Sequence, residues 1–141
     1  MGNVDQASVG RLYADFMATG DESLLALFGD EFHDHVSDTR GPGVWLLVKQ
    51  WLDESFSDRE VEIHSVATDG DLTHVWVTVE GTHIGSAFPW LANRPASGRR
   101  VAWRQVHIFR LADGQITEHW AVRDDLRVLE TIDAPSTLEP N

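Results

Sequence analysis

Hydrophobic positions recur at helical spacing in the first third of the chain. From residue 5 to about residue 18 they fall three or four positions apart, which predicts a helix ending at Gly20. Asp21 can cap a short second helix through Phe28, and residues 41–43 open a third helix to about residue 56. Residues 32–39, between the second and third helices, are too polar for a core segment but carry a regular pattern.

Beyond residue 58 the spacing of the hydrophobic residues changes from the helical period to alternation with polar residues. The alternation predicts a strand to residue 67, a turn at residues 69–71 and a strong strand over residues 72–83. Residues 85–98 form a long irregular connection, which is typical of a lid or a binding edge. Two apolar runs then flank Asp113 and Gly114, a dipeptide that favours a hairpin turn. Helices followed by at least four strands predict an α+β domain with the helices on one face of an antiparallel sheet.

The first strand of this hairpin has two unlike faces. Trp103, Gln105, His107 and Phe109 alternate along it and therefore share one face. Two large rings, an amide and an imidazole on one face are typical of a pocket wall. The opposite face is also partly apolar, so the sheet is expected to need cover on both sides.

Composition narrows the class of protein. A chain of 141 residues predicts a single domain, with an ordered core over about residues 4–132 and a flexible tail at 133–141. The absence of cysteine excludes disulfides, a thiolate nucleophile and cysteine zinc ligands, and the net charge of −12 disfavours nucleic acid. No apolar segment is long enough to span a membrane and no signal-like start is present, which predicts a cytoplasmic protein. Six tryptophans suit an apolar ligand pocket or a subunit interface.

Three motifs carry a resemblance to a known family. These are residues 81–85 (GTHIG), 97–100 (SGRR) and 106–120 (VHIFRLADGQITEHW). The pattern resembles the SnoaL-like polyketide cyclases of the nuclear transport factor 2-like superfamily, over roughly residues 4–132. The resemblance implies a conical pocket between helices and a curved antiparallel or mixed sheet. It also implies a homodimer packed through the outer sheet face, a small apolar or polyketide-like ligand, and no cofactor.

The same resemblance implies a chemistry. These cyclases close a ring by an intramolecular aldol reaction on a polyketide methyl ester, using an acidic side chain and a histidine on the neighbouring strand. The histidine carries over to His107, but the acidic position falls on Ala121. One hypothesis is therefore cofactor-free acid/base catalysis (cyclisation, isomerisation or dehydration), with His119 or Asp124 replacing the lost carboxylate. The alternative is a non-catalytic ligand-binding domain.

Other side chains are candidates for ligand contacts. His33 and His35 alternate on an extended segment and are expected at the pocket mouth; a metal site there would need a third ligand, and none is predicted. His83, at a strand end, either faces the pocket or bonds the following loop. The predicted substrate-binding residues are His33, His35, Trp45, His83, Trp103, Gln105 and Phe109.

Overall fold

The computed structural model describes residues 6–135, which form helices and one sheet. The helical elements are α1 (Ser8–Thr19), η1 (Glu22–Leu27), α2 (Val44–Ser55), η2 (Pro89–Leu91) and α3 (Asp125–Asp133), of which η1 and η2 are 3₁₀ helices. The strands are β1 (Phe28–Asp34), β2 (Thr39–Arg40), β3 (Phe56–Asp69), β4 (Leu72–His83), β5 (Arg100–Ala112) and β6 (Gln115–Arg123). None of the helices within residues 6–135 is long and apolar enough to cross a bilayer.

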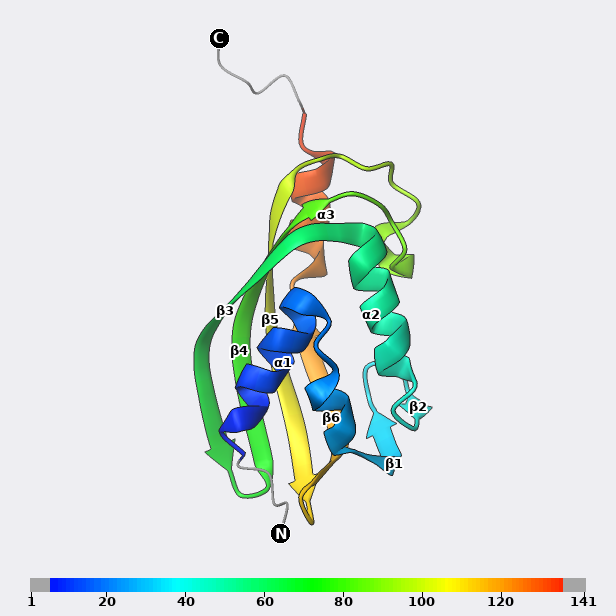
Figure 1. The fold of residues 1–141 in the computed structure, drawn as a ribbon. Helices are drawn as coiled ribbons and strands as arrows, with labels where there is room; N and C mark the ends of the chain where they lie inside the picture. The colour runs from blue at the N-terminus through cyan, green and yellow to red at the C-terminus, as the bar shows by residue number, and fades with distance from the viewer. Residues whose placement is uncertain (1–5, 136–141) are drawn as a thin grey trace.

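The sheet is mixed and curved. Its strand order is β2-β1-β6-β5-β4-β3, with β1 parallel to β6 and the other neighbours antiparallel. Register shifts interrupt the β3–β4 pairing between Ser57 and Glu60 and between Ile63 and Ser65, and such bulges bend a strand. The long strands curve around α1 and α2, which lie on the concave side (Figure 1). The predicted α+β class, with helices on one face, is confirmed.

Helix α1 closes the concave side because its apolar stripe faces the sheet. Val9, Tyr13, Phe16 and Met17 are all buried. Gly10 allows the close approach to β3, since a Cβ there would lie 2.6 Å from Val66 Cγ2. The helix ends at Gly20 as predicted, with the left-handed φ of 79° that glycine adopts readily.

The region between α1 and α2 differs from expectation. Phe28 begins a strand instead of completing a helix, and the helix before it is a 3₁₀ helix. Residues 32–39 were expected to be too polar for the core, but Phe32 is fully buried and Asp34 only 5% exposed. The physical reason is the parallel pairing of β1 with β6, which brings Asp34 beside His119 and supplies its carboxylate with a partner.

After β6 the chain forms a helix, α3, that the spacing of hydrophobic residues did not predict. Helix α3 packs Val128 and Ile132 into the core, and its last residue is Asp133. Asp133 therefore belongs to a helix instead of the predicted flexible tail, while residues 136–141 of that tail lie outside the described residues.

The hairpin of β5 and β6 turns at Asp113 and Gly114, as predicted, with φ angles of 54° and 77°. On the outer face of the sheet, opposite the helices, Trp76, Val106 and Val122 are exposed. Trp76 pairs with Val106 and Val106 with Val122, so the three side chains form a continuous row across β4, β5 and β6.

Candidate active site

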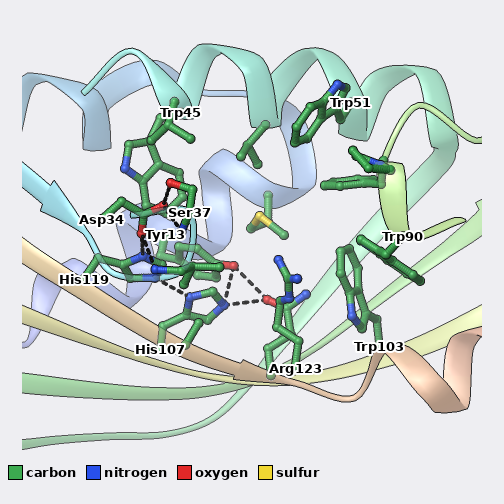
Figure 2. Close-up of a pocket in the computed structure, with 18 residues that line it drawn as sticks. Tyr13, Asp34, Ser37, Trp45, Trp51, Trp90, Trp103, His107, His119 and Arg123 are labelled. Atoms are coloured by element: carbon green, nitrogen blue, oxygen red, sulfur yellow. Dashed lines mark hydrogen bonds and ion pairs between the residues drawn. The ribbon is translucent and has the colours of Figure 1, made fainter. Parts of the chain in front are cut away.

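A cavity of about 270 Å³ lies between the helices and the concave face of the sheet. Its wall is mostly apolar and aromatic, as is usual for a small-molecule site. Figure 2 shows the polar side chains gathered at the sheet side of this cavity. The cavity is lined, among others, by Tyr13 and Met17 of α1, Asp34 of β1, Ser37 between β1 and β2, Trp45, Val48 and Trp51 of α2, Phe88, Pro89 and Trp90 of the β4–β5 connection, Trp103, Gln105 and His107 of β5, and His119, Ala121 and Arg123 of β6.

A chain of hydrogen bonds runs from β1 to the cavity (Figure 2). The carboxylate of Asp34 lies 2.8 Å from His119 Nδ1, and His119 Nε2 lies 2.8 Å from His107 Nδ1. His107 Nε2 in turn lies 2.6 Å from the hydroxyl of Tyr13 and 2.6 Å from the Gln105 amide. Four elements, β1, β6, β5 and α1, thus hold one continuous polar chain in an apolar surrounding.

A bulge in β6 turns His119 toward the cavity, where it joins the hydrogen-bonded chain. Leu111 pairs with Ile116 but Arg110 pairs with Glu118, so Thr117 is an extra residue. Without it, the two-residue turn would pair His119 with Ile108 and aim it at the outer face. With it, His119 pairs with Phe109, and its ring stacks 5.1 Å from that of His107.

Burial holds the members of the chain in defined protonation states. Burial lowers the pKa of His107 well below its ordinary value, and the positive charges of Arg123 and of His119 in its protonated form oppose protonation of His107 further. Burial also lowers the pKa of His119, although hydrogen bonding to Asp34 opposes the shift. Burial raises the pKa of Asp34, but hydrogen bonds from His119 and Ser37 outweigh it, so the net shift is downward. Near neutral pH the site therefore holds a carboxylate and two neutral imidazoles.

The phenol of Tyr13 completes this set, because burial raises its pKa well above the ordinary value and keeps it protonated. Its ring lies 4.2 Å from that of His107. A protonated phenol beside a neutral imidazole supplies a proton donor and a proton acceptor at one place.

Arg123 brings a positive charge into the cavity. Its side chain rises from the sheet between His107 and Trp103 (Figure 2). Asp125, at the start of α3, bonds Arg123 at 3.2 Å and accepts a 2.8 Å hydrogen bond from the Trp103 indole. The guanidinium also lies over the Trp103 ring at 5.7 Å. Helix α3 therefore positions a cation that can hold a ligand oxygen bearing negative charge.

Five of the predicted site residues reach the cavity, four from the hairpin strands and one from α2. His107, His119, Trp45, Trp103 and Gln105 all line the cavity. Phe109 is buried behind the wall, where its ring packs 4.9 Å from that of His119. Phe109 thus supports the site without lining the cavity.

His83 takes the second of its two predicted places. It is fully buried outside the cavity wall, and its Nδ1 meets the hydroxyl of Ser97 at 2.9 Å and the backbone N–H of Ser97 at 3.1 Å. Burial lowers the pKa of His83, so the neutral ring accepts that N–H. His83 therefore fastens the β4–β5 connection, whose residues 88–90 line the cavity.

Asp124 does not converge with the histidines, contrary to expectation. Its carboxylate accepts hydrogen bonds from Arg104 at 2.6 Å and from the backbone N–H of Arg127 at 3.2 Å, so it caps α3 at the surface. Those two hydrogen bonds, led by the one from Arg104, lower its pKa, the opposite of what a base near neutral pH needs. The register of β6 causes this, because Asp124 follows the last residue of the strand.

His33 and His35 also lie away from the cavity wall. His33 Nε2 lies 3.0 Å from Asp38, and His35 Nε2 lies 3.0 Å from Glu118. Their rings contact each other at 3.9 Å on the rim of the sheet. Within residues 6–135 no group of three or more His, Cys, Asp or Glu side chains is arranged to hold a metal ion.

Sequence reasoning missed Tyr13, Asp34 and Arg123. Arg123 has the parity of His119 and Ala121, so the alternation of β6 could have placed it on the same face. Tyr13 could have been noticed as the polar-tipped ring in the buried stripe of α1. Asp34 had no local signal, because only the pairing of β1 with β6 brings it to His119.

Comparisons with known proteins identify the family of the chain. The sequence profile described as SnoaL-like polyketide cyclase matches residues 7–132. The aklanonic acid methyl ester cyclase DnrD of Streptomyces peucetius is 31% identical over 90 residues, which are 61% of this chain and 57% of that protein. The nogalonic acid methyl ester cyclase of Streptomyces nogalater is 28% identical over 81 residues, 56% of this chain and 57% of that protein. The chain thus matches little more than half the length of these curated relatives.

Among solved structures, TsrD from Streptomyces laurentii superposes with a TM-score of 0.76 at 24% identity, covering 94% of this chain and 100% of that one. This likeness shows a shared fold over nearly the whole chain.

Proposed function

Because the chain belongs to the SnoaL-like polyketide cyclase family, we propose that it closes a ring in a polyketide-like ester by cofactor-free proton transfer. The observation that carries the proposal is the meeting of His107, Tyr13 and Arg123 at one apolar cavity. The histidine accepts a proton, the phenol donates one, and the guanidinium holds negative charge. An intramolecular aldol closure needs these three functions.

In the proposed reaction, the Tyr13 hydroxyl turns from His107 Nε2 to the substrate carbonyl that becomes the alkoxide, and His107 Nε2 then takes a proton from a carbon that lies next to another carbonyl. Arg123 stabilises the enolate oxygen, and the mostly apolar wall of the cavity strengthens this electrostatic interaction. The enolate carbon attacks a second carbonyl of the same molecule and forms the ring C–C bond. The new alkoxide takes the proton of Tyr13, and His107 returns its proton to Tyr13. The sum is an isomerisation, since no atom is gained or lost.

The cavity wall supports an apolar, ring-shaped substrate. Trp45, Trp51, Trp90 and Trp103 line it from three sides. Aromatic walls can hold a flat molecule in one conformation, in which the enolate carbon lies close to the carbonyl carbon that it attacks.

The direct test uses aklanonic acid methyl ester and nogalonic acid methyl ester, followed by chromatography with mass spectrometry. We expect a product of unchanged mass and changed retention time. His107→Ala should abolish it with the circular dichroism spectrum unchanged, whereas His64→Ala, at an exposed histidine on β3, should retain it. Full turnover by His107→Ala would exclude His107 as the base.

Ala121 supports a second candidate, a ligand-binding domain without turnover. It lines the cavity beside His107, its partner on the neighbouring strand, and its methyl side chain stands where a longer side chain could place a carboxylate. On this hypothesis both esters quench tryptophan fluorescence on binding and no product forms. Ala121→Asp then creates cyclase activity, which would identify a domain that lost one catalytic group.

We also infer that the outer face of the sheet joins two copies of the chain. The row of Trp76, Val106 and Val122 is exposed, with Val122 at 76%. Contiguous apolar side chains on a sheet face mark an interaction surface. A symmetric dimer would bury the row against itself.

A further inference from the structure

With Asp34 ionised and both histidines neutral, the chain from Asp34 to Tyr13 admits one arrangement of protons. A carboxylate accepts hydrogen bonds, so His119 Nδ1 must carry the proton in their 2.8 Å contact. Neutral His119 then has a bare Nε2, which obliges His107 Nδ1 to carry the proton in the next 2.8 Å contact. His107 Nε2 is consequently bare, and it accepts the Tyr13 proton across 2.6 Å.

Gln105 is consistent with this arrangement if its amide nitrogen faces His107. The structure places Gln105 Oε1 there, 2.6 Å from His107 Nε2 and 2.8 Å from the Tyr13 hydroxyl, which would set two acceptors against each other if His107 Nε2 is bare. The Gln105 nitrogen is also buried with no hydrogen-bond partner among the described residues. Turning the amide by half a rotation removes the contact between two acceptors, because the amide N–H₂ then faces His107 Nε2 and the Tyr13 oxygen, and the oxygen, not a donor, takes the place that lacks a partner.

We propose that Asp34 is a positioning residue, which fixes the tautomers of His119 and His107 so that the bare Nε2 of His107 faces the Tyr13 hydroxyl at the cavity. The carboxylate stands on β1, two hydrogen bonds away from the histidine that meets the substrate. Through these two hydrogen bonds Asp34 sets which nitrogen of His107 carries the proton. The methyl side chain of Ala121, next to His107, has no carboxylate that could do so by direct contact. A misoriented tautomer leaves a catalytic histidine in place but without its lone pair.

The surroundings of Asp34 determine what a neutral replacement does. Its second oxygen accepts from the hydroxyl and the backbone N–H of Ser37, at 2.6 and 3.3 Å. In Asp34→Asn the two Ser37 donors, of which the hydroxyl lies at 2.6 Å, outweigh the 3.4 Å contact of the Val36 N–H with the other position, so they hold the amide oxygen and the amide N–H₂ faces His119 Nδ1. The chain then reverses, and His107 carries its proton on Nε2, where it cannot act as a base.

The first experiment reads tautomers without substrate. Protein labelled with ¹⁵N-histidine is examined by NMR at pH 7.5, and the ring nitrogen shifts give the site of each proton. We expect Nδ1–H for His119 and His107 in the wild type, and Nε2–H for His107 in Asp34→Asn. Nε2–H for His107 in the wild type would overturn the proposal by itself, whether or not the variant folds.

The second experiment measures turnover and rests on the proposed function. With aklanonic acid methyl ester, Asp34→Asn should lower kcat at least about 100-fold and leave KM within about twofold, because the apolar wall is unchanged. The matched control is Asp38→Asn, which makes the same change in an exposed histidine–aspartate pair and should retain activity. Adding Ala121→Asp to Asp34→Asn should restore part of kcat, by placing a carboxylate opposite His107.

The two experiments separate the two ideas. Wild-type protein with the expected tautomers but no turnover of either ester contradicts the proposed function and leaves the relay intact. Asp34→Asn with wild-type kcat, or with unchanged His107 tautomer, contradicts the relay.

Discussion

The buried histidines should make the fold sensitive to mild acid. His107 and His119 are neutral in the folded protein because burial lowers the pKa of both, and most strongly that of His107. In the unfolded chain each returns to an ordinary pKa of about 6.5. Below that pH the unfolded state binds more protons than the folded state, so the free energy of unfolding falls as the pH drops. Above it, neither histidine contributes.

The size of the effect follows from the same values. Between pH 7.5 and 5.0, a histidine that stays neutral in the fold but titrates at about 6.5 when unfolded costs about 2 kcal/mol. His107 contributes this amount, and His119 adds up to a similar amount, because its bond to Asp34 limits the lowering of its pKa. The expected loss from the pair is therefore about 2–4 kcal/mol, a large part of a typical folding free energy.

Urea unfolding followed by tryptophan fluorescence measures this loss at the two pH values. The net charge of −12 at pH 7 complicates a direct reading, because acid also relieves repulsion between carboxylates. The comparison is therefore made against His107→Gln, which removes one titrating group and leaves the surface charge unchanged. The variant should lose about 2 kcal/mol less than the wild type between pH 7.5 and 5.0. An equal loss in both proteins would refute the assignment of His107 as a buried neutral base.

Other perturbations test the supports of the site. Phe109→Ala should lower the free energy of unfolding by about 3–5 kcal/mol in urea titrations, because a fully buried ring leaves a cavity; a loss below about 1 kcal/mol would contradict its place in the core. Arg123→Gln should lower kcat/KM, and it should move the acid limb of the pH–rate profile to higher pH, since the positive charge of Arg123 lowers the pKa of His107. An acid limb that stays at the same pH in Arg123→Gln would contradict the electrostatic coupling between Arg123 and His107. Val122→Glu should convert a dimer into a monomer in sedimentation velocity, and a wild-type protein that sediments as a monomer would exclude the proposed interface.

The local pattern was sufficient for much of the fold and for one wall of the site. Two-residue alternation placed Trp103, Gln105 and His107 on one face, because side chains of a strand point to opposite sides in turn. The end of α1 at Gly20 and the turn at Asp113 and Gly114 followed from backbone preferences of single residues. Such signals need no knowledge of distant parts of the chain.

The placement of the other polar residues of the site depended on contacts between segments that are distant in the sequence. The sequence alone determined that His107 faces a pocket, since strand geometry is local. Only the tertiary structure decided that His119 joins it, because a bulge at Thr117 changes which face His119 occupies. Only the pairing of β1 with β6 decided that Asp34 completes the chain, 85 residues away from His119 in sequence. A carboxylate without a partner is costly to bury, and its partner here exists only once the sheet has formed.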